Sequence, residues 1–356
     1  MIYHRISNDE NMEKYLDTPV LLTFFVKSST LEKVFSMIRE VKPRVLFLVS
    51  DGPREGYIDD VENVKKCREI VENVDWKCDV HKYYQVANRG ILDNLYYGLT
   101  NAFKMTDRLI FLEDDKLPTK SFFYFCDELL EKYKNDERIL RICGGNHCGI
   151  YEKCTSDYFF ARYQYSGAMG MWRRSYEELD REFVFLKNKY IKECLESSLP
   201  KEWKNLIKKA SIARRDFLED GLPKSDELMA ELELYLQNRC NIYPKRNLVV
   251  DIGCVQGSEH CPDDIRKVPK AFQQSIMNAS YEIEGKLKHP DYVLPDMLFE
   301  QTLLERNGAD SGLKQFLIKI ETFFRYWKYG SFHEAIVKLK RYIRRKLNNK
   351  TDKNGL

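Results

Sequence analysis

The first 150 residues alternate short apolar runs with segments of helical periodicity. Apolar runs of the length and composition of strands occur at Val20–Val26, Val45–Val49, Cys78–Tyr83, Leu109–Leu112 and Ile139–Cys143. Segments with apolar residues at helical spacing lie between them, at Leu31–Val41, Val61–Val71, Ile91–Phe103 and Phe122–Tyr133. Strands that alternate with helices form a mostly parallel sheet with helices on both faces. The sequence therefore predicts an α/β fold.

Three polar clusters follow predicted strands. They are Lys27–Ser28–Ser29, Ser50–Asp51–Gly52 and Glu113–Asp114–Asp115. The carboxyl ends of parallel strands lie at one edge of a sheet, and ligands bind beyond that edge. We therefore expect the three clusters to lie close together, at a binding site.

The cluster in RLIFLEDDKL places three adjacent carboxylates directly after a buried strand. Adjacent carboxylates repel one another and are costly to desolvate. Oxygen ligands of this kind suit Mg²⁺ or Mn²⁺, which are commonly shared with substrate phosphates. The sequence predicts such a metal here; an acidic surface turn is the alternative.

Other features limit the class of protein. No apolar run reaches the length of about 18 residues that a membrane-spanning helix needs, and the first residues lack the apolar segment of a secretory signal. The 10 cysteines show no repeated spacing, which favours a reducing, cytoplasmic setting. The sequence has no GxGxxG, P-loop, HExxH or GxSxG motif.

The charge is concentrated at the C-terminus. Residues 311–356 hold 12 Lys and Arg against 3 Asp and Glu, a charge of +9, whereas the other residues hold 46 against 52, a charge of −6. Apolar residues at helical spacing also occur there, at Phe332, Ile336, Leu339, Ile343 and Leu347. A basic amphipathic helix is typical of contact with an anionic membrane; a helix docked on the domain is the alternative. No nucleic-acid-binding motif is present, and we expect no nucleic-acid partner.

The stretch RLIFLEDD resembles the metal-site strand of GT-A-fold glycosyltransferases, in particular bacterial enzymes related to the N-acetylglucosaminyltransferase I type. That family's first strand and helix are similar to PVLLTFFVKSSTLEKVFSMI, although Val26–Lys27 replaces its usual Asn-Arg. Its second strand, next loop, acceptor-side segment and closing strand are similar to FLVSDGPR, QVANRGILDNLYYGL, SGAMGMWRRSY and IYPKRNLVVDIGCVQGSEH. The resemblance covers about Pro19–Cys261 and implies a GT-A fold, to which the charge and helical spacing of the C-terminus add a basic helical extension.

The resemblance also implies roles for individual residues. Asp115 would ligate the metal, Glu113 and Asp114 would contact the ribose or the sugar, and Asp51 would contact the nucleobase. The remaining implied positions are Asn88 and Arg89 beside the nucleotide or donor sugar, Trp172 in the donor or acceptor pocket, and His260 near the diphosphate or metal. Each has an ordinary structural alternative, such as a turn, the core or a surface loop.

Direct displacement at a sugar carbon needs a carboxylate that accepts the proton of the attacking hydroxyl. The family's base lies at a helix start, which here corresponds to PKSDELMAELELYL. Asp226 and Glu227 are the candidates and Asp226 is preferred, with Glu219 and Asp220 as weaker ones. A Ser-Asp-Glu start is also normal for any helix, because Ser225 or Asp226 can cap it and acids favour its dipole.

The sequence thus predicts four parts: an N-terminal arm (1–18), a nucleotide-sugar-binding half (19–150), an acceptor-binding half (151–270) and a helical basic extension (271–356). The predicted activity is metal-dependent, inverting transfer of a sugar from a nucleotide-diphosphate sugar, most readily a UDP-sugar, to a glycan or lipid-linked hydroxyl. This activity belongs to surface polysaccharide biosynthesis, at the cytoplasmic face of the cell membrane. A nucleotidyltransferase is one alternative, although LTFFVKSST lacks that class's Gly-rich loop. A non-catalytic membrane-associated protein is the other.

Overall fold

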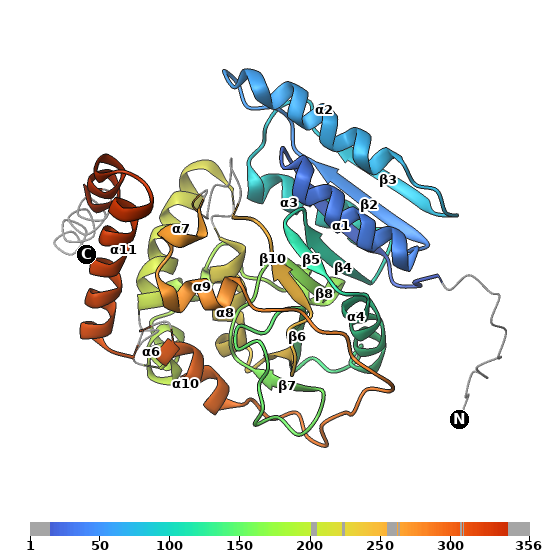
Figure 1. Ribbon diagram of the computed structural model, residues 1–356. Coiled ribbons are helices and arrows are strands. Elements are labelled where there is room, and N and C mark those ends of the chain that lie inside the picture. The colour runs from blue at the N-terminus through green and yellow to red at the C-terminus, as the bar shows by residue number, and fades with distance from the viewer. Residues whose placement is uncertain are drawn as a thin grey trace.

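The computed structural model describes residues 15–200, 205–222, 225–254, 262, 264–306, 308 and 310–340. Its centre is an eight-stranded sheet with the order β3-β2-β1-β4-β8-β6-β9-β7 (Figure 1). The strands are β1 (Val20–Phe24), β2 (Val45–Ser50), β3 (Asp79–Tyr84), β4 (Arg108–Glu113), β6 (Ile139–Cys143), β7 (Tyr158–Ala161), β8 (Ala168–Trp172) and β9 (Cys240–Pro244).

The first four strands of the sheet are parallel. β1 lies between β2 and β4, and β3 pairs with β2. Thr23 of β1 is opposite Glu113 of β4, and Phe24 is opposite Ser50 of β2. β1, β2 and β4 therefore end at the same level of the sheet. The polar clusters that follow them share one edge of the sheet, as predicted.

The second half of the sheet is mixed. β8 runs antiparallel to both β4 and β6, β9 is parallel to β6, and β7 is antiparallel to β9. The segment that resembles the family's closing strand contains β10 (Val249–Asp251), which pairs outside the main sheet with β5 (Lys116–Pro118). This small sheet brings a late segment of the chain to the residues that directly follow the three carboxylates.

Helices cover both faces of the sheet (Figure 1). On one face lie α1 (Ser28–Val41), α2 (Ile58–Glu72) and α4 (Lys120–Lys132); on the other lie α3 (Ile91–Phe103), α5 (Arg173–Glu177), α6 (Lys189–Ser198), α7 (Asn205–Asp220) and α8 (Asp226–Leu236). Successive strand residues point to opposite faces, so Val20 and Leu22 pack with the first group and Leu21 with the second. The predicted α/β class is confirmed.

The C-terminal part consists of η3 (Ile265–Lys267), α9 (Lys270–Ile276), α10 (Met297–Arg306) and α11 (Gly312–Tyr329). Figure 1 shows α11 at the margin of the molecule, away from the sheet. The predicted amphipathic helix is present over residues 332–340; its positions Ile343 and Leu347 lie outside the described residues. None of the helices described is long and apolar enough to cross a bilayer.

Candidate functional site

The three carboxylates gather where β4 ends, and we call Glu113, Asp114 and Asp115 the acidic cluster. Glu113 is the last residue of β4, and the other two form the turn into β5. Asp114 is buried and accepts a hydrogen bond from the backbone N–H of Phe25 at 3.1 Å. Burial raises the pKa of both Glu113 and Asp114 to about 7. The acidic cluster is therefore largely buried at the edge of the sheet, unlike an open acidic turn on the surface.

Two lysines neutralise part of the charge of the acidic cluster. Lys27, which follows β1, donates to Asp115 Oδ2 at 2.7 Å. The Nζ of Lys116 lies 3.9 Å from Asp115 Oδ1 and 2.5 Å from Asp251 Oδ2. Asp251 was not among the predicted site residues. It joins the cluster because β10 and β5 pair with Asp251 opposite Lys116.

The residues present fit a divalent cation that the substrate helps to ligate. The Oδ1 atom of Asp115 is buried and has no hydrogen-bond partner. A Cβ on Gly253 would lie 2.5 Å from Asp115 Oδ2 and 3.0 Å from Asp251 Oδ1, so a larger residue there would crowd both carboxylates. Within the described ranges no three His, Cys, Asp or Glu side chains form a metal cage. Mg²⁺ commonly uses one or two carboxylates with water and phosphates. Asp115 and Asp251 would supply the two; His260 lies outside the described residues.

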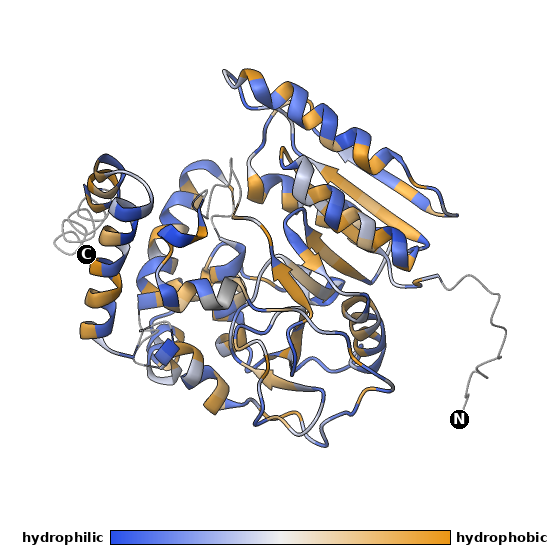
Figure 2. Ribbon diagram, in the orientation of Figure 1, coloured by the Kyte–Doolittle hydropathy of each residue, from blue (hydrophilic) through white to orange (hydrophobic). Residues whose placement is uncertain are grey.

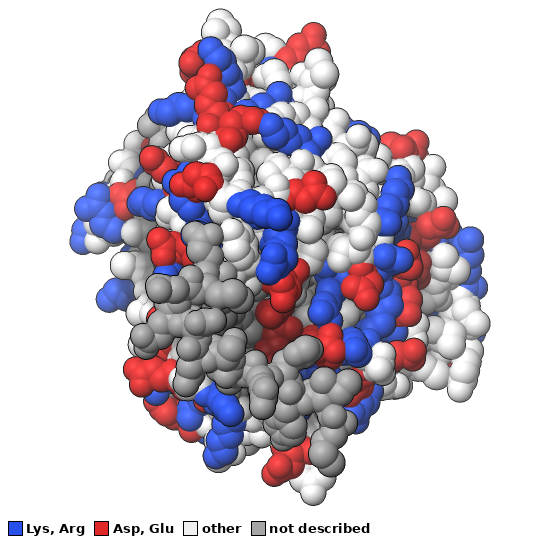
Figure 3. Space-filling view, turned by 90° about the vertical axis from the view of Figure 1, so that its right-hand side faces the viewer, with Lys and Arg blue, Asp and Glu red and all other residues white. Residues whose placement is uncertain are grey.

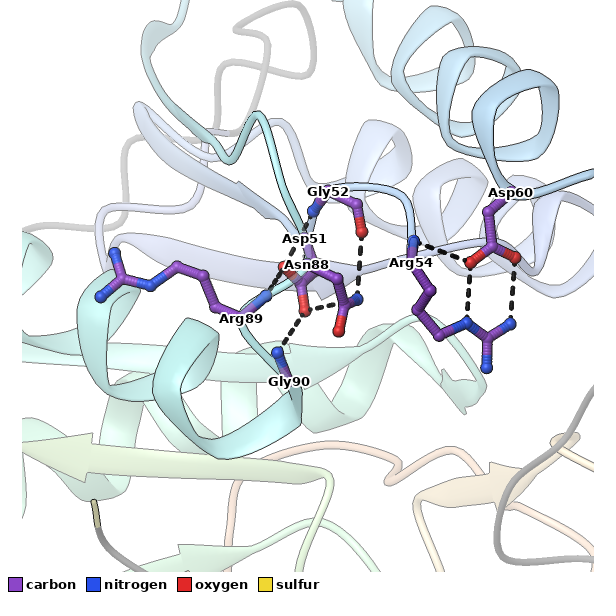
Figure 4. A network of polar contacts seen from close by, with 7 residues as sticks. All are labelled: Asp51, Gly52, Arg54, Asp60, Asn88, Arg89 and Gly90. Atoms are coloured by element: carbon purple, nitrogen blue, oxygen red, sulfur yellow. Dashed lines mark hydrogen bonds and ion pairs between the residues drawn. The ribbon is translucent and has the colours of Figure 1, made fainter. Parts of the chain in front are cut away.

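Asp51 forms the centre of a polar network at the end of β2 (Figure 4). Its Oδ1 accepts from the backbone N–H groups of Gly52 and Arg89, both at 2.8 Å. Its Oδ2 accepts from the N–H of Gly90 at 3.0 Å and from Asn88 Nδ2 at 3.1 Å. Four donors fill the acceptor positions of a carboxylate. Asp51 therefore ties the loop after β2 to the loop before α3, and burial raises its pKa.

The other predicted nucleotide contacts of this network are also engaged within the protein. Asn88 Nδ2 donates a second bond to the carbonyl of Gly52 at 3.0 Å. The guanidinium of Arg89 pairs with Asp93 at 2.8 Å and lies 4.8 Å from the ring centre of Tyr97. The Arg89 side chain remains partly exposed at the loop surface. A nucleoside could stack on or pair with this loop, but Asp51 would have to exchange a donor to contact it.

Trp172 is not brought to the acidic cluster. It is the last residue of β8 and lies opposite Arg108, the first residue of β4, whereas the cluster follows the other end of β4. Its side chain is buried, and its Nε1 donates to the carbonyl of Leu130 at 3.1 Å. The predicted pocket role was implied by the resemblance of SGAMGMWRRSY, and in the structure Trp172 is a core residue.

A cavity of about 440 Å³ opens beside the acidic cluster and is lined by Lys116 and Asp251, of which Lys116 lies 3.9 Å from Asp115. Its remaining lining is amide, aromatic and acidic: Gly145, Asn146, His147, Tyr163, Gln164, Tyr165, Ser166, Glu227, Glu231, Asn247, Val249 and Phe272. Burial lowers the pKa of His147 to about 4, so its imidazole is neutral at physiological pH. Neutral hydrogen-bonding groups beside aromatic rings suit a polar, uncharged ligand.

The two candidate bases at the start of α8 differ in their surroundings. Ser225 caps the helix, as predicted, by accepting from the N–H of Leu228 at 3.1 Å. Asp226 forms two hydrogen bonds with the guanidinium of Arg141, at 2.9 and 3.0 Å, and accepts from Tyr96 Oη at 3.2 Å. Arg141 is only 1% exposed. Asp226 is therefore committed to a buried ion pair and does not line the cavity.

Glu227 lines the cavity and accepts a hydrogen bond from Ser166 Oγ at 2.8 Å. Glu231, one helical turn later, lines the cavity as well, and burial raises its pKa to about 7. Glu231 was not among the predicted site residues, although its spacing of four residues from Glu227 puts both on one helix face. The weaker candidates Glu219 and Asp220 are exposed at the end of α7 and do not line the cavity.

The pKa of Glu231 predicts a pH-dependent stability. Burial raises the native pKa from 4.5 to about 7, so the protein must ionise a disfavoured group as the pH rises through that window. Glu231→Gln removes this cost. We expect the free energy of unfolding of the variant, relative to that of the natural protein, to rise by about 2–3 kcal/mol from pH 5 to pH 8, as measured by urea unfolding. A difference that does not change with pH would contradict the burial of an ionisable Glu231.

No protein-family model matches the sequence, and no curated protein is significantly similar to it. Among solved structures, the mannosyltransferase PcManGT from Pyrobaculum calidifontis, in complex with GDP-Man and Mn²⁺, is 10% identical with a TM-score of 0.41, and the match covers 94% of this chain and 84% of that chain. UDP-glucose pyrophosphorylase complexed with UDP-glucose is 11% identical with a TM-score of 0.34, over 68% of this chain and 96% of that one. Mouse xyloside xylosyltransferase 1 is 12% identical with a TM-score of 0.33, over 62% and 82%. Likeness at this level decides neither fold nor activity, which rest on the chain's own geometry.

Proposed function

We propose that the protein is a metal-dependent glycosyltransferase that moves a sugar from a nucleoside-diphosphate sugar to a hydroxyl group. The observation that carries this proposal is the continuity of two unlike sites. The cavity that holds Glu227 and Glu231 is also lined by Lys116, whose ammonium group pairs with Asp251 and lies 3.9 Å from Asp115 of the acidic cluster. A site for a metal-bound diphosphate and a carboxylate for proton transfer are thus contiguous, as a transfer between two bound substrates requires.

The acidic cluster is the diphosphate end in this proposal. Asp115 and Asp251 would hold Mn²⁺ or Mg²⁺, which supplies positive charge to the departing diphosphate. The ammonium groups of Lys27 and Lys116, now paired with these carboxylates, lie where they can also contact phosphate oxygens. Glu113 and Asp114 would contact the ribose or sugar, and the loop with Asp51, Asn88 and Arg89 would lie at the nucleoside, most readily that of a UDP-sugar.

The cavity is the acceptor end. The acceptor oxygen forms a bond to the sugar's anomeric carbon while the bond from that carbon to the diphosphate breaks, and its electron pair leaves with the diphosphate. The hydroxyl proton passes to Glu227 or Glu231. Attack opposite the leaving group inverts the anomeric centre. In this proposal Asp226 positions the start of α8 through Arg141 and does not take the proton.

The proposed binding roles correspond to the predicted parts of the chain. Residues 19–150 would bind the nucleotide, and residues 151–270 would supply most of the acceptor cavity. We further propose a glycan or lipid-linked acceptor, in surface polysaccharide biosynthesis at the inner face of the cell membrane. The GT-A resemblance of the EDD segment and the basic C-terminal residues support this reading.

A ligand screen tests the proposal. UDP-, GDP- and other nucleotide sugars are added to the full chain with Mn²⁺, with Mg²⁺ and with chelator, and thermal unfolding is recorded. A true donor at 100 times its Kd should stabilise the fold by about 2.7 kcal/mol, and more strongly with metal than without. If no nucleotide or nucleotide sugar stabilises the protein, the proposed function fails.

The product distinguishes the nucleotidyltransferase alternative. A glycosyltransferase releases a nucleoside diphosphate from its donor, whereas a nucleotidyltransferase forms or consumes pyrophosphate. Incubation of the stabilising nucleotide sugar with mixed glycan acceptors should therefore release nucleoside diphosphate. Pyrophosphate-dependent breakdown of the nucleotide sugar to a nucleoside triphosphate would favour the alternative.

A further inference from the structure

Helix α11 presents a continuous apolar surface to solvent. The residues of this apolar stripe, each between 37% and 67% exposed, are Leu313, Phe316, Leu317, Ile320, Phe324 and Trp327. Their spacing of three and four residues places them on one face of the helix. No residue of α11 is buried, and Figure 2 shows hydrophobic positions along this helix at the margin of the molecule. Several large apolar side chains in one exposed row indicate an interaction surface.

The opposite side of α11 fixes the helix to the body. Glu321 Oε1 accepts from the N–H of Lys270 at 3.0 Å, and Arg325 Nη1 donates to the carbonyl of Arg266 at 3.1 Å. The guanidinium of Arg266 lies 5.2 Å from the ring centre of Tyr329. A further ion pair at 2.8 Å joins Lys267 to Glu334, just beyond the helix. These contacts hold α11 in one rotation, with the stripe outward.

The charge of this region identifies the kind of surface that it fits. Residues 311–356 carry a charge of +9, and 341–356 alone hold 6 Lys and Arg against 1 Asp. By contrast, the side of the molecule opposite α11 shows Lys and Arg interspersed with Asp and Glu (Figure 3). An aromatic and aliphatic stripe within a strongly basic segment is complementary to an anionic lipid surface, in which rings enter the headgroup region and cations meet phosphates.

We propose that α11 lies flat on an anionic membrane, with the apolar stripe inserted at the headgroup level. This contact does not depend on the substrate of the protein. Its consequence for orientation does rest on the proposed function. α11 is bonded to Arg266 and Lys270, and α9, which begins at Lys270, contributes Phe272 to the cavity wall. A membrane-bound protein would therefore hold the acceptor cavity one short helix away from the lipid surface.

Vesicle sedimentation tests the contact. The full chain should sediment with vesicles of phosphatidylglycerol and phosphatidylcholine and not with phosphatidylcholine alone. The variant Phe316→Gln/Phe324→Gln should lose at least about ten-fold in partitioning, since each side chain removes a large buried apolar area. The matched control is Ile58→Gln/Val61→Gln, which changes two exposed apolar residues of α2 and should bind as the natural protein does.

Trp327 provides a second measurement. Of the three tryptophans that the structure describes, Trp327 is 50% exposed and Trp76 and Trp172 are buried, so the fluorescence of Trp327 should shift to the blue with anionic vesicles. Trp327→Phe should remove that shift. Equal sedimentation of the α11 variant and the control would overturn the proposal, as would a fluorescence shift unchanged in Trp327→Phe. A self-association of the chain that the α11 variant alone abolishes, without vesicle binding, would identify a second copy as the occupant instead. Since no nucleotide sugar is present, failure here leaves the proposed sugar transfer standing and removes only its placement at the membrane.

Discussion

Asp115→Asn is expected to lower the rate of sugar transfer by at least about 100-fold, because a metal that neutralises a leaving group contributes several kcal/mol to the barrier. The substitution keeps the volume of the side chain and an oxygen that can accept the hydrogen bond from Lys27. It removes the charge at the one carboxylate of the cluster that has a buried, unpartnered oxygen. The loss should therefore appear in metal binding and not in folding. The measurements are turnover and the metal-dependent part of thermal stabilisation by the nucleotide sugar.

Asp75→Asn is the matched control, since Asp75 is a 62% exposed carboxylate that pairs with Arg39 at the surface. It should leave both readouts unchanged. A non-catalytic protein predicts instead that Asp115→Asn has no effect on function. If the variant retained full turnover and the same response to Mn²⁺, the assignment of Asp115 to a metal would be wrong.

The arrangement of the strands could be predicted because it depends on local apolar runs and their order. Val20–Phe24, Val45–Ser50 and Arg108–Glu113 form strands close to the predicted ranges, and their parallel register brings the polar clusters together. The arrangement of the mixed half of the sheet was harder to predict from the sequence. β8 and β9 contain five residues each, and nothing local indicates that β8 runs antiparallel between β4 and β6.

The site was predicted where its residues follow the parallel strands, and the contacts that depend on distant pairing were missed. Asp251 joins the acidic cluster through a three-residue strand that pairs with residues more than a hundred positions earlier, and no local signal encodes that pairing. The choice between Asp226 and Glu227 depends on Arg141, a residue of β6 whose side chain reaches Asp226. Helical spacing could have added Glu231, but its burial follows from tertiary packing. Trp172 is an error of the opposite kind. The resemblance of a short segment implied a pocket position for its side chain, whereas the register of β8 places that side chain in the core.

Asp226→Ala is expected to reduce the free energy of unfolding by about 3–5 kcal/mol, the usual cost of removing one partner of a buried ion pair. The variant leaves the guanidinium of Arg141 without its two hydrogen bonds to a carboxylate at a position 1% exposed, and Arg141 Nε already has no partner. Urea unfolding, with the midpoint and slope both fitted, measures the loss.

Glu227→Ala is the matched control, because Glu227 is the next residue in the same helical turn and its carboxylate accepts only the exposed hydrogen bond from Ser166. We expect it to cost about 1 kcal/mol or less in stability, the net value of an ordinary hydrogen bond. The double variant Asp226→Leu/Arg141→Met should recover much of the lost stability, since replacing both partners removes the unpaired charge. The rate of sugar transfer then distinguishes the roles of the two acids. On our assignment, Glu227→Ala slows transfer in a protein of nearly normal stability, whereas Asp226→Ala unfolds at a lower urea concentration. A stable Asp226→Ala protein without activity would return the proton-accepting role to Asp226.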